Sequence, residues 1–146
     1  MKARIEMHKA APAAYEAMRT LSTFANECGL EASLLELVKL RASQINGCAF
    51  CLHMHARDAR KAGETEMRIH LLPAWRESPG YTDRERAALA WTEALTLLTE
   101  GHAPDAVYDE VRSQFSEEEV AKLSLAIAVI NSWNRLAVGM RFVPKL

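Results

Sequence analysis

The chain has 146 residues, of which 49% are hydrophobic and 25% are charged, and its formal net charge is −1. This size and balance are typical of one globular domain with a buried core, so we expect a single domain over residues 1–146. A net charge this small gives no electrostatic reason to expect nucleic acid or an anionic membrane as a partner.

The N-terminal segment MKARIEMHKAAP carries charges and lacks the apolar stretch of a secretory signal. No segment approaches the roughly 18 uninterrupted apolar residues of a membrane span, and these features favour a cytoplasmic protein. In a reducing cytosol, two neighbouring cysteines are more often redox-active or metal-binding than a permanent crosslink. The odd total of three cysteines also argues against a disulfide framework.

The spacing of apolar residues is helical along most of the chain and predicts an all-α fold. Glycines and an Asn-Gly pair mark where the first helices end. The pattern predicts helices from Pro12 to Gly29, from Ser33 to Ile45, from Cys48 to Ala62 and from Thr65 to Leu71.

The second half begins with a loop, Pro73 to Tyr81, that contains two prolines and a glycine. Capping boxes at Thr82 and Ser116 then predict helix starts, because each is followed three residues later by a glutamate. The predicted helices run from Thr82 to Glu100, from Pro104 to Phe115, and from Ser116 to Gly139. The last one is apolar on so many sides that we expect it to be central or to lie at a subunit contact.

The stretch INGCAFCLHMHARD holds two of the three cysteines and two of the five histidines. On a helix, Cys48, Cys51 and His55 stand at i, i+3 and i+7 and share one face, whereas His53 points away. A helix beginning after Asn46-Gly47 places the first thiol among unpaired backbone N–H groups, which favour the thiolate.

This arrangement can support a redox cycle. Two cysteines three residues apart can close a disulfide, so one can attack an oxidant while the other resolves the sulfenic acid. His55 lies one turn beyond Cys51 and could accept a proton from a thiol.

Glu36 interrupts a run of leucines twelve positions before Cys48. A buried carboxylate there would have a raised pKa and could exchange protons near neutral pH. The alternative is a solvent-facing glutamate paired with Lys39 or Arg41.

Other interpretations of the cysteines and histidines stay open. A zinc site made of Cys48, Cys51, His53 and His55 would need a non-helical knuckle, so we expect no metal. Inert core cysteines are a second alternative. For the remaining residues of these types, we expect Cys28 to be a small core or helix-end residue and His8, His70 and His102 to lie on the surface.

Three segments together resemble the carboxymuconolactone decarboxylase and alkylhydroperoxidase AhpD-like superfamily. They are ELVKLRASQINGCAFCLHMHARDARKAGETE (36–66), LLPAWRESPGYTDRERAALAWTEALT (71–96) and INSWNRLAVG (130–139), and the likeness extends over about 13–141. The specific pattern is a glutamate, eleven residues, Cys-x-x-Cys, three residues and a histidine, which resembles the peroxidase branch.

The resemblance implies an AhpD-like helical bundle that assembles into a dimer, trimer or hexamer. It also implies roles for four residues. Cys51 would be the peroxidatic thiol and Cys48 the resolving thiol, and Glu36 with His55 would form a proton relay.

One position departs from the family pattern. The best-characterised members have a histidine between the two cysteines, where this chain has Phe50. Phe50 cannot exchange protons, so the substrate preference or rate could differ. The decarboxylase branch does not depend on a thiol pair, so Cys48 and Cys51 favour peroxidase chemistry.

We therefore predict a cytoplasmic thiol peroxidase that reduces hydroperoxides in antioxidant defence, without a cofactor. An external dithiol, lipoyl-type or thioredoxin-like, would restore the thiols. The alternatives are a thiol-disulfide oxidoreductase, a decarboxylase of cyclic lactone acids that uses Arg41 or His55, and a structural or zinc-binding oligomer.

Overall fold

A computed structural model describes residues 1–145, and within that range the chain is built from helices with no β-strand. The predicted all-α class is confirmed. The elements in chain order are α1 (Met7–Ala10), α2 (Pro12–Asn26), α3 (Ala32–Ile45), α4 (Ala49–Lys61), α5 (Glu66–Leu71), the 3₁₀ helix η1 (Leu72–Ala74), α6 (Asp83–Thr96), α7 (Leu98–Gly101), α8 (Asp105–Gln114) and α9 (Glu117–Met140).

Most predicted helix ends are confirmed because they depend on local backbone chemistry. Both capping boxes form, at Thr82 before α6 and at Ser116 before α9. Gly29 and Gly63 follow α2 and α4 with φ of 95° and 94°, a region that a side chain would make unfavourable. Pro12 occupies the first turn of α2, where its missing N–H costs nothing.

Two parts of the helix prediction were wrong. The short helix α1 was not anticipated, and the helix predicted to run from Thr82 to Glu100 is interrupted at Leu97, where ψ is 41°. The break follows Thr96, whose side chain is buried and accepts a hydrogen bond from Asn131 on α9. A tertiary contact therefore holds the end of α6, and such a contact leaves no local signal in the sequence.

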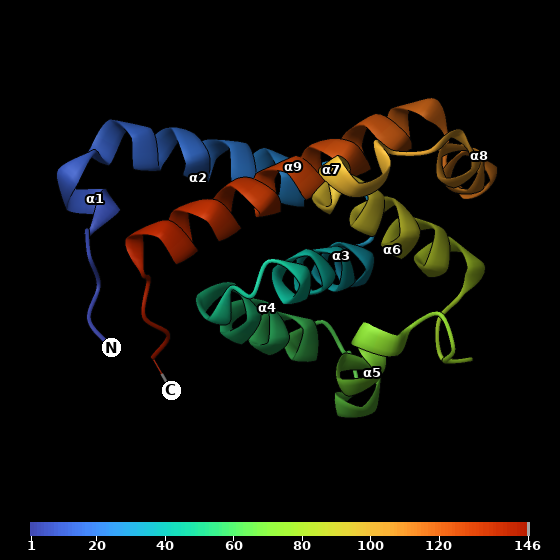
Figure 1. Ribbon diagram of the computed structural model, residues 1–146, viewed down its shortest axis with the longest axis horizontal. Coiled ribbons are helices and arrows are strands. Elements are labelled where there is room, and N and C mark those ends of the chain that lie inside the picture. Colours follow the sequence, from blue (N-terminus) through green and yellow to red (C-terminus); the bar gives the residue numbers. More distant parts are fainter. Residues whose placement is uncertain (146) are drawn as a thin grey trace.

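Helix α3 lies at the centre of the bundle and packs against α4, α6 and α9, while α2 runs along α9 (Figure 1). Among the described residues, α9 is the one helix long and apolar enough to suit a membrane span. It packs against α2, α3, α4, α6 and α8 within the chain. Of the two roles predicted for it, packing inside the bundle is observed, and a subunit contact stays a prediction.

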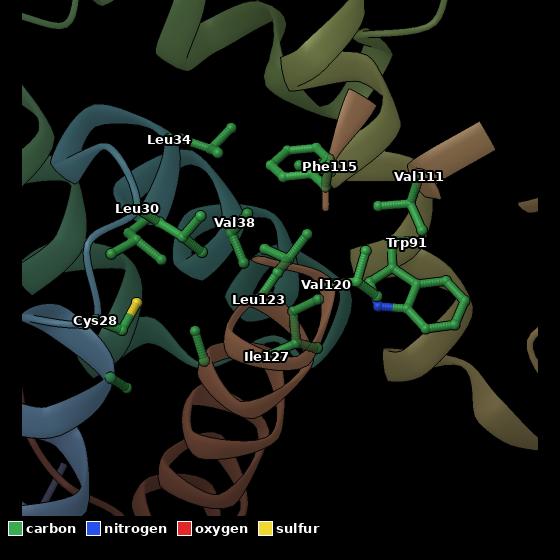
Figure 2. Close-up of a cluster of buried hydrophobic side chains, with 14 of the residues drawn as sticks. Cys28, Leu30, Leu34, Val38, Trp91, Val111, Phe115, Val120, Leu123 and Ile127 are labelled. Atoms are coloured by element: carbon green, nitrogen blue, oxygen red, sulfur yellow. The ribbon is translucent and has the colours of Figure 1, made fainter. Parts of the chain in front are cut away.

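The largest hydrophobic cluster joins α3, α6, α8 and α9 (Figure 2). Cys28 is a free thiol at the edge of this cluster and is buried, so its prediction as a small core residue is confirmed. The labelled side chains that share this cluster with it are Leu30, Leu34, Val38, Trp91, Val111, Phe115, Val120, Leu123 and Ile127.

A separate, smaller cluster surrounds the paired cysteines. Cys48 and Cys51 pack with Ala42 of α3 and with Ile130 and Ala137 of α9. The thiol pair therefore lies where α3, α4 and α9 meet, enclosed by apolar side chains.

Candidate active site

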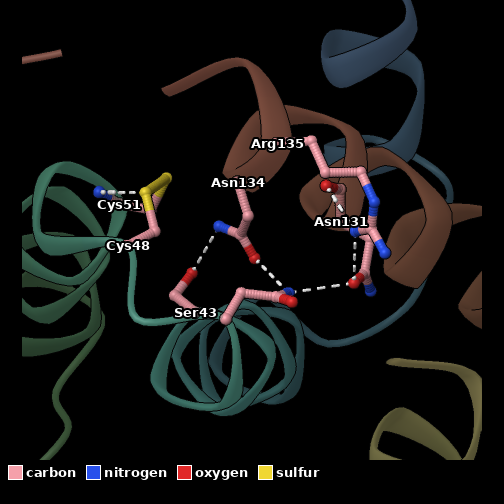
Figure 3. Close-up of a disulfide and its surroundings, with 7 residues drawn as sticks. Ser43, Cys48, Cys51, Asn131, Asn134 and Arg135 are labelled. Atoms are coloured by element: carbon pink, nitrogen blue, oxygen red, sulfur yellow. Dashed lines mark hydrogen bonds between the residues drawn. A yellow bond between two sulfur atoms is a disulfide. The ribbon is translucent and has the colours of Figure 1, made fainter. Parts of the chain in front are cut away.

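The cysteines occupy the first turn of α4. Cys48 is the N-cap residue, and its Sγ accepts a hydrogen bond from the backbone N–H of Cys51 at 3.3 Å. An N–H donor at a helix N-terminus stabilises negative charge on this sulfur. The two cysteines form a disulfide (Figure 3), and their exposed fractions are only 1% and 2%.

The turn before Cys48 is held by the backbone. Gly47 has a φ of 64°, and the N–H of Cys48 donates to the carbonyl oxygen of Ser43 at 3.0 Å. The Asn-Gly pair that ends α3 thus also starts α4, and it fixes the direction in which the thiols point.

Glu36 and His55 meet between α3 and α4. The Nδ1 atom of His55 lies 2.9 Å from Oε2 of Glu36, and both side chains are largely buried. The sequence analysis selected both residues, and the structure brings them together. His53, on the opposite side of α4, is only partly buried and does not share this contact.

Lys39 is a third member of this group, although its spacing predicted only a solvent-facing partner for Glu36. Its Nζ lies 2.7 Å from the other carboxylate oxygen of Glu36, Oε1, and its exposed fraction is 8%. The alternative of a solvent-facing pair between Glu36 and Lys39 was right about the partner and wrong about the exposure. Arg41 instead pairs with Glu93 at 2.8 Å.

The prediction that Glu36 has a raised pKa was wrong. Burial alone would raise the pKa of this carboxyl, but the hydrogen bond from His55 and the charges of His55 and Lys39 outweigh burial, and its pKa lies below the ordinary value of 4.5. Glu36 is therefore ionised at neutral pH and accepts hydrogen bonds on both oxygens. The Nδ1 atom of His55 must then carry a hydrogen, so that in the neutral ring Nε2 is the proton acceptor.

A cavity of about 580 Å³ opens beside this group. Cys51, His55 and Lys39 line it, whereas Cys48 and Glu36 lie behind them and do not. Residues near both ends of the chain also line the cavity, and the Arg4 N–H joins the two ends by donating to the Met140 carbonyl oxygen at 2.9 Å. The apolar part of the wall includes Tyr15, Phe50, Met54, Val129, Trp133 and Phe142.

A buried polar network lies beside the thiol turn, between the end of α3 and α9 (Figure 3). The side-chain amide of Asn46 donates to Oδ1 of both Asn131 and Asn134 at 2.9 Å, and Asn134 donates to Oγ of Ser43 at 3.0 Å. The network ties α9 to the residues just before Cys48. The sequence analysis did not identify it, because its members are more than 80 residues apart and an asparagine in a helix has no distinctive local pattern.

The remaining predicted residues separate into those near the cavity and those away from it. Phe50 lines the cavity and packs edge-on against Phe142, with ring centroids 5.5 Å apart. His70 and His102 lie on the surface as predicted. His8 is also exposed, but it borders the cavity beside Tyr15.

The regular helix of α4 is incompatible with the zinc site that was considered as an alternative. The segment that would have to form a non-helical knuckle is regular helix, so His53 and His55 lie on different faces of α4. Within residues 1–145, no group of three or more His, Cys, Asp or Glu side chains is placed to hold a metal ion.

Comparison with known proteins confirms the family resemblance. The pattern of the Carboxymuconolactone decarboxylase family matches residues 10–94. YdfG, an uncharacterised protein of Bacillus subtilis, is 41% identical over 140 residues, which are 96% of this chain and 95% of YdfG.

Solved structures share the fold. A protein of unknown function from Agrobacterium tumefaciens, provisionally assigned to antioxidant defence as AhpD, superposes with a TM-score of 0.97 and 46% identity over 99% of both chains. This match confirms the AhpD-like bundle. An uncharacterised peroxidase-related protein from Silicibacter sp. TM1040 has a TM-score of 0.79 and 21% identity, over 89% of this chain and 69% of its own, and shows the likeness of fold alone.

Proposed function

The chain belongs to the carboxymuconolactone decarboxylase family, and we propose that it is a thiol peroxidase that reduces organic hydroperoxides through Cys51 and Cys48. The observation that carries the proposal is the shared cavity: Cys51 opens onto the same cavity as His55, and Cys48 lies close enough behind it to form a disulfide. Neither thiol needs to move to another part of the molecule during the cycle.

The first step oxidises Cys51. Nε2 of His55 takes the thiol proton, and the sulfur lone pair then attacks the terminal oxygen of the hydroperoxide. The O–O bond breaks, so Cys51 becomes a sulfenic acid and the substrate leaves as an alcohol once its oxygen gains a proton.

The second step closes the disulfide. The Cys48 sulfur, whose negative charge is stabilised by the Cys51 N–H, attacks the sulfenic sulfur and releases water. An external dithiol then restores both thiols. Because Cys51 is the sulfur on the cavity, the dithiol attacks it, and Cys48 leaves as the stabilised thiolate. The buried position of the pair favours a slender dithiol such as a lipoyl group over a bulky protein surface.

The residues that line the cavity favour an organic hydroperoxide over hydrogen peroxide as the substrate. Its lining is mainly aromatic and aliphatic, and about 580 Å³ is large enough for a substantial apolar group. Phe50, which replaces the histidine usual at this position, adds to the apolar wall.

Two alternative functions fit the site less well. A disulfide reductase acting on other proteins would need an accessible thiol, and both cysteines are almost completely buried. A lactone decarboxylase would make no use of the thiol pair, and of the two residues predicted to contact its substrate, Arg41 is engaged with Glu93 outside the cavity lining.

Stopped-flow measurements on the reduced protein test the proposal. We expect rapid reaction with cumene hydroperoxide, slow reaction with a small-molecule disulfide of similar size, and losses of about 100-fold in Glu36→Gln and His55→Gln. Cys28→Ser is the matched control and should react like the wild type, because Cys28 lies in a different cluster. A protein inert to hydroperoxides but fast with disulfides would overturn the proposal.

We also propose that the protein acts in the cytoplasm as a dimer, trimer or hexamer, as the family resemblance implies. Sedimentation equilibrium would measure the number of subunits. A monomer at micromolar concentration would contradict this proposal without affecting the chemistry proposed for the cavity.

A further inference from the structure

Lys39 has no role in the cycle described so far, although its position is unusual. A lysine is rarely buried unless its charge is compensated. Lys39 has an exposed fraction of 8%, and its ammonium group faces the carboxylate of Glu36 at 2.7 Å. It lines the same cavity as Cys51 and His55.

The ammonium group has donors to spare. Lysine Nζ carries three hydrogens, and within residues 1–145 Nζ of Lys39 makes one hydrogen bond, to Oε1 of Glu36. The other N–H groups are available to an oxygen atom in the cavity. An electropositive donor that shares a cavity with a nucleophilic sulfur is suited to stabilise the negative charge that develops on a leaving oxygen.

Glu36 connects this donor to the base. One carboxylate oxygen faces Nδ1 of His55 and the other faces Nζ of Lys39, while Glu36 itself lies outside the cavity wall. The cavity therefore presents a base and an acid side by side, bridged by a single carboxylate from behind.

We propose that Lys39 is a further catalytic residue that donates the proton to the leaving oxygen of the hydroperoxide. This inference rests on the peroxidase function proposed above. Sulfur of Cys51 forms a bond to the terminal oxygen, the O–O bond breaks, and its electron pair goes to the RO oxygen, which takes a proton from Nζ. The products are the Cys51 sulfenic acid, the alcohol ROH, neutral Lys39 and protonated His55.

Proton exchange with solvent in the cavity returns the site to its starting state. Protonated His55 releases the Nε2 proton that it took from Cys51, and neutral Lys39 takes up one proton at Nζ. Glu36 stays ionised throughout and keeps its contacts with both side chains. The net reaction is Cys51 thiol plus ROOH giving Cys51 sulfenic acid plus ROH, with no proton gained or lost.

If Lys39 donates this proton, its loss should slow the reaction with some hydroperoxides more than with others. A strongly basic leaving oxygen, such as tert-butoxide from tert-butyl hydroperoxide, needs a proton donor. Acetate, the leaving group of peracetic acid, is a weak base and leaves without one. Loss of the donor should therefore slow the first substrate far more than the second.

The test is single-turnover disulfide formation in the reduced full-length protein, followed by quenched flow and alkylation of the remaining thiols. For Lys39→Met we expect a loss of about 100-fold with tert-butyl hydroperoxide and of at most about 3-fold with peracetic acid. Lys61→Met is the control, because Lys61 is an exposed lysine at the end of α4, and it should match the wild type with both oxidants.

Lys39→Arg keeps a cation beside Glu36. It therefore tests the proton transfer even if Lys39→Met folds poorly. Because a guanidinium hardly gives up its proton, we expect the selective loss with tert-butyl hydroperoxide to persist in this variant. Full recovery of the rate in Lys39→Arg, or equal losses with both oxidants in Lys39→Met, would overturn the inference. A wild-type protein inert to both oxidants would instead overturn the proposed peroxidase function.

Discussion

His55 and Glu36 come from different helices, nineteen residues apart, and meet with Nδ1 and Oε2 at 2.9 Å. This contact orients the imidazole so that its other nitrogen is free to act as the base. In the proposed cycle, the carboxylate of Glu36 stabilises the proton on His55 from outside the cavity lining, next to a thiol pair that lies in an apolar cluster.

The position of Cys51 on the cavity predicts which thiol is oxidised first. In Cys48→Ser treated with cumene hydroperoxide and dimedone, the sulfenic acid cannot be resolved, so we expect a dimedone adduct on Cys51. In Cys51→Ser we expect no adduct on Cys48, because Cys48 does not line the cavity. Peptide mass spectrometry measures both, and an adduct on Cys48 alone would reverse the assignment.

The lowered pKa of Glu36 predicts a dependence of stability on pH. Burial by itself would raise this pKa, but His55 and Lys39 lower it to below 4.5, so the ionised group stabilises the folded state above that pH. As the pH falls through the pKa of the folded protein, this contribution is lost.

Urea unfolding of the wild type and Glu36→Gln measures this contribution. We expect the difference in unfolding free energy to be largest at neutral pH and to shrink as the pH falls below 4.5. Glu16→Gln is the control, because Glu16 forms only an exposed pair with Arg19 and should change stability little at any pH. A difference for Glu36→Gln that does not vary with pH would contradict the prediction.

Removing a member of the buried amide network beside the thiol turn should lower the unfolding free energy. Asn134→Ala removes one of the two acceptors of the Asn46 amide and the donor to Oγ of Ser43, and we expect it to lower the unfolding free energy by about 2 kcal/mol. Ser132→Ala is the matched change on α9; its hydroxyl bonds only to the Ala128 carbonyl at an exposed site, and we expect a change within about 0.5 kcal/mol. Chemical denaturation followed by circular dichroism compares the two, and equal effects would show that the network contributes nothing specific.

Phe50 is expected to influence the choice of substrate. Its ring lines the cavity and contacts Phe142, so Phe50→Ala removes apolar contact that a bulky substrate can use. We expect kcat/KM for cumene hydroperoxide to fall about 10-fold, with a much smaller change for hydrogen peroxide. Phe24→Ala removes an exposed ring on α2 and is the control; equal losses for both peroxides in Phe50→Ala would indicate general damage to the site.

The sequence alone determined most of the helix ends and one face of the candidate active site. Capping boxes, prolines and glycines act over a few residues, so the ends of α2, α4 and α9 could be predicted without knowledge of the rest of the fold. Cys51 and His55 lie on one rigid helix, so their spacing alone places them on a common face.

Only the tertiary structure decided what surrounds that face. The ionised state of Glu36 depends on Lys39 and His55 together, which is why an argument from burial alone predicted the wrong direction for its pKa. The cavity is lined by residues of α2, α3, α4 and α9 and of both chain ends, and the asparagine network joins residues more than 80 positions apart. These features depend on packing between distant segments, and packing has no local sequence signal.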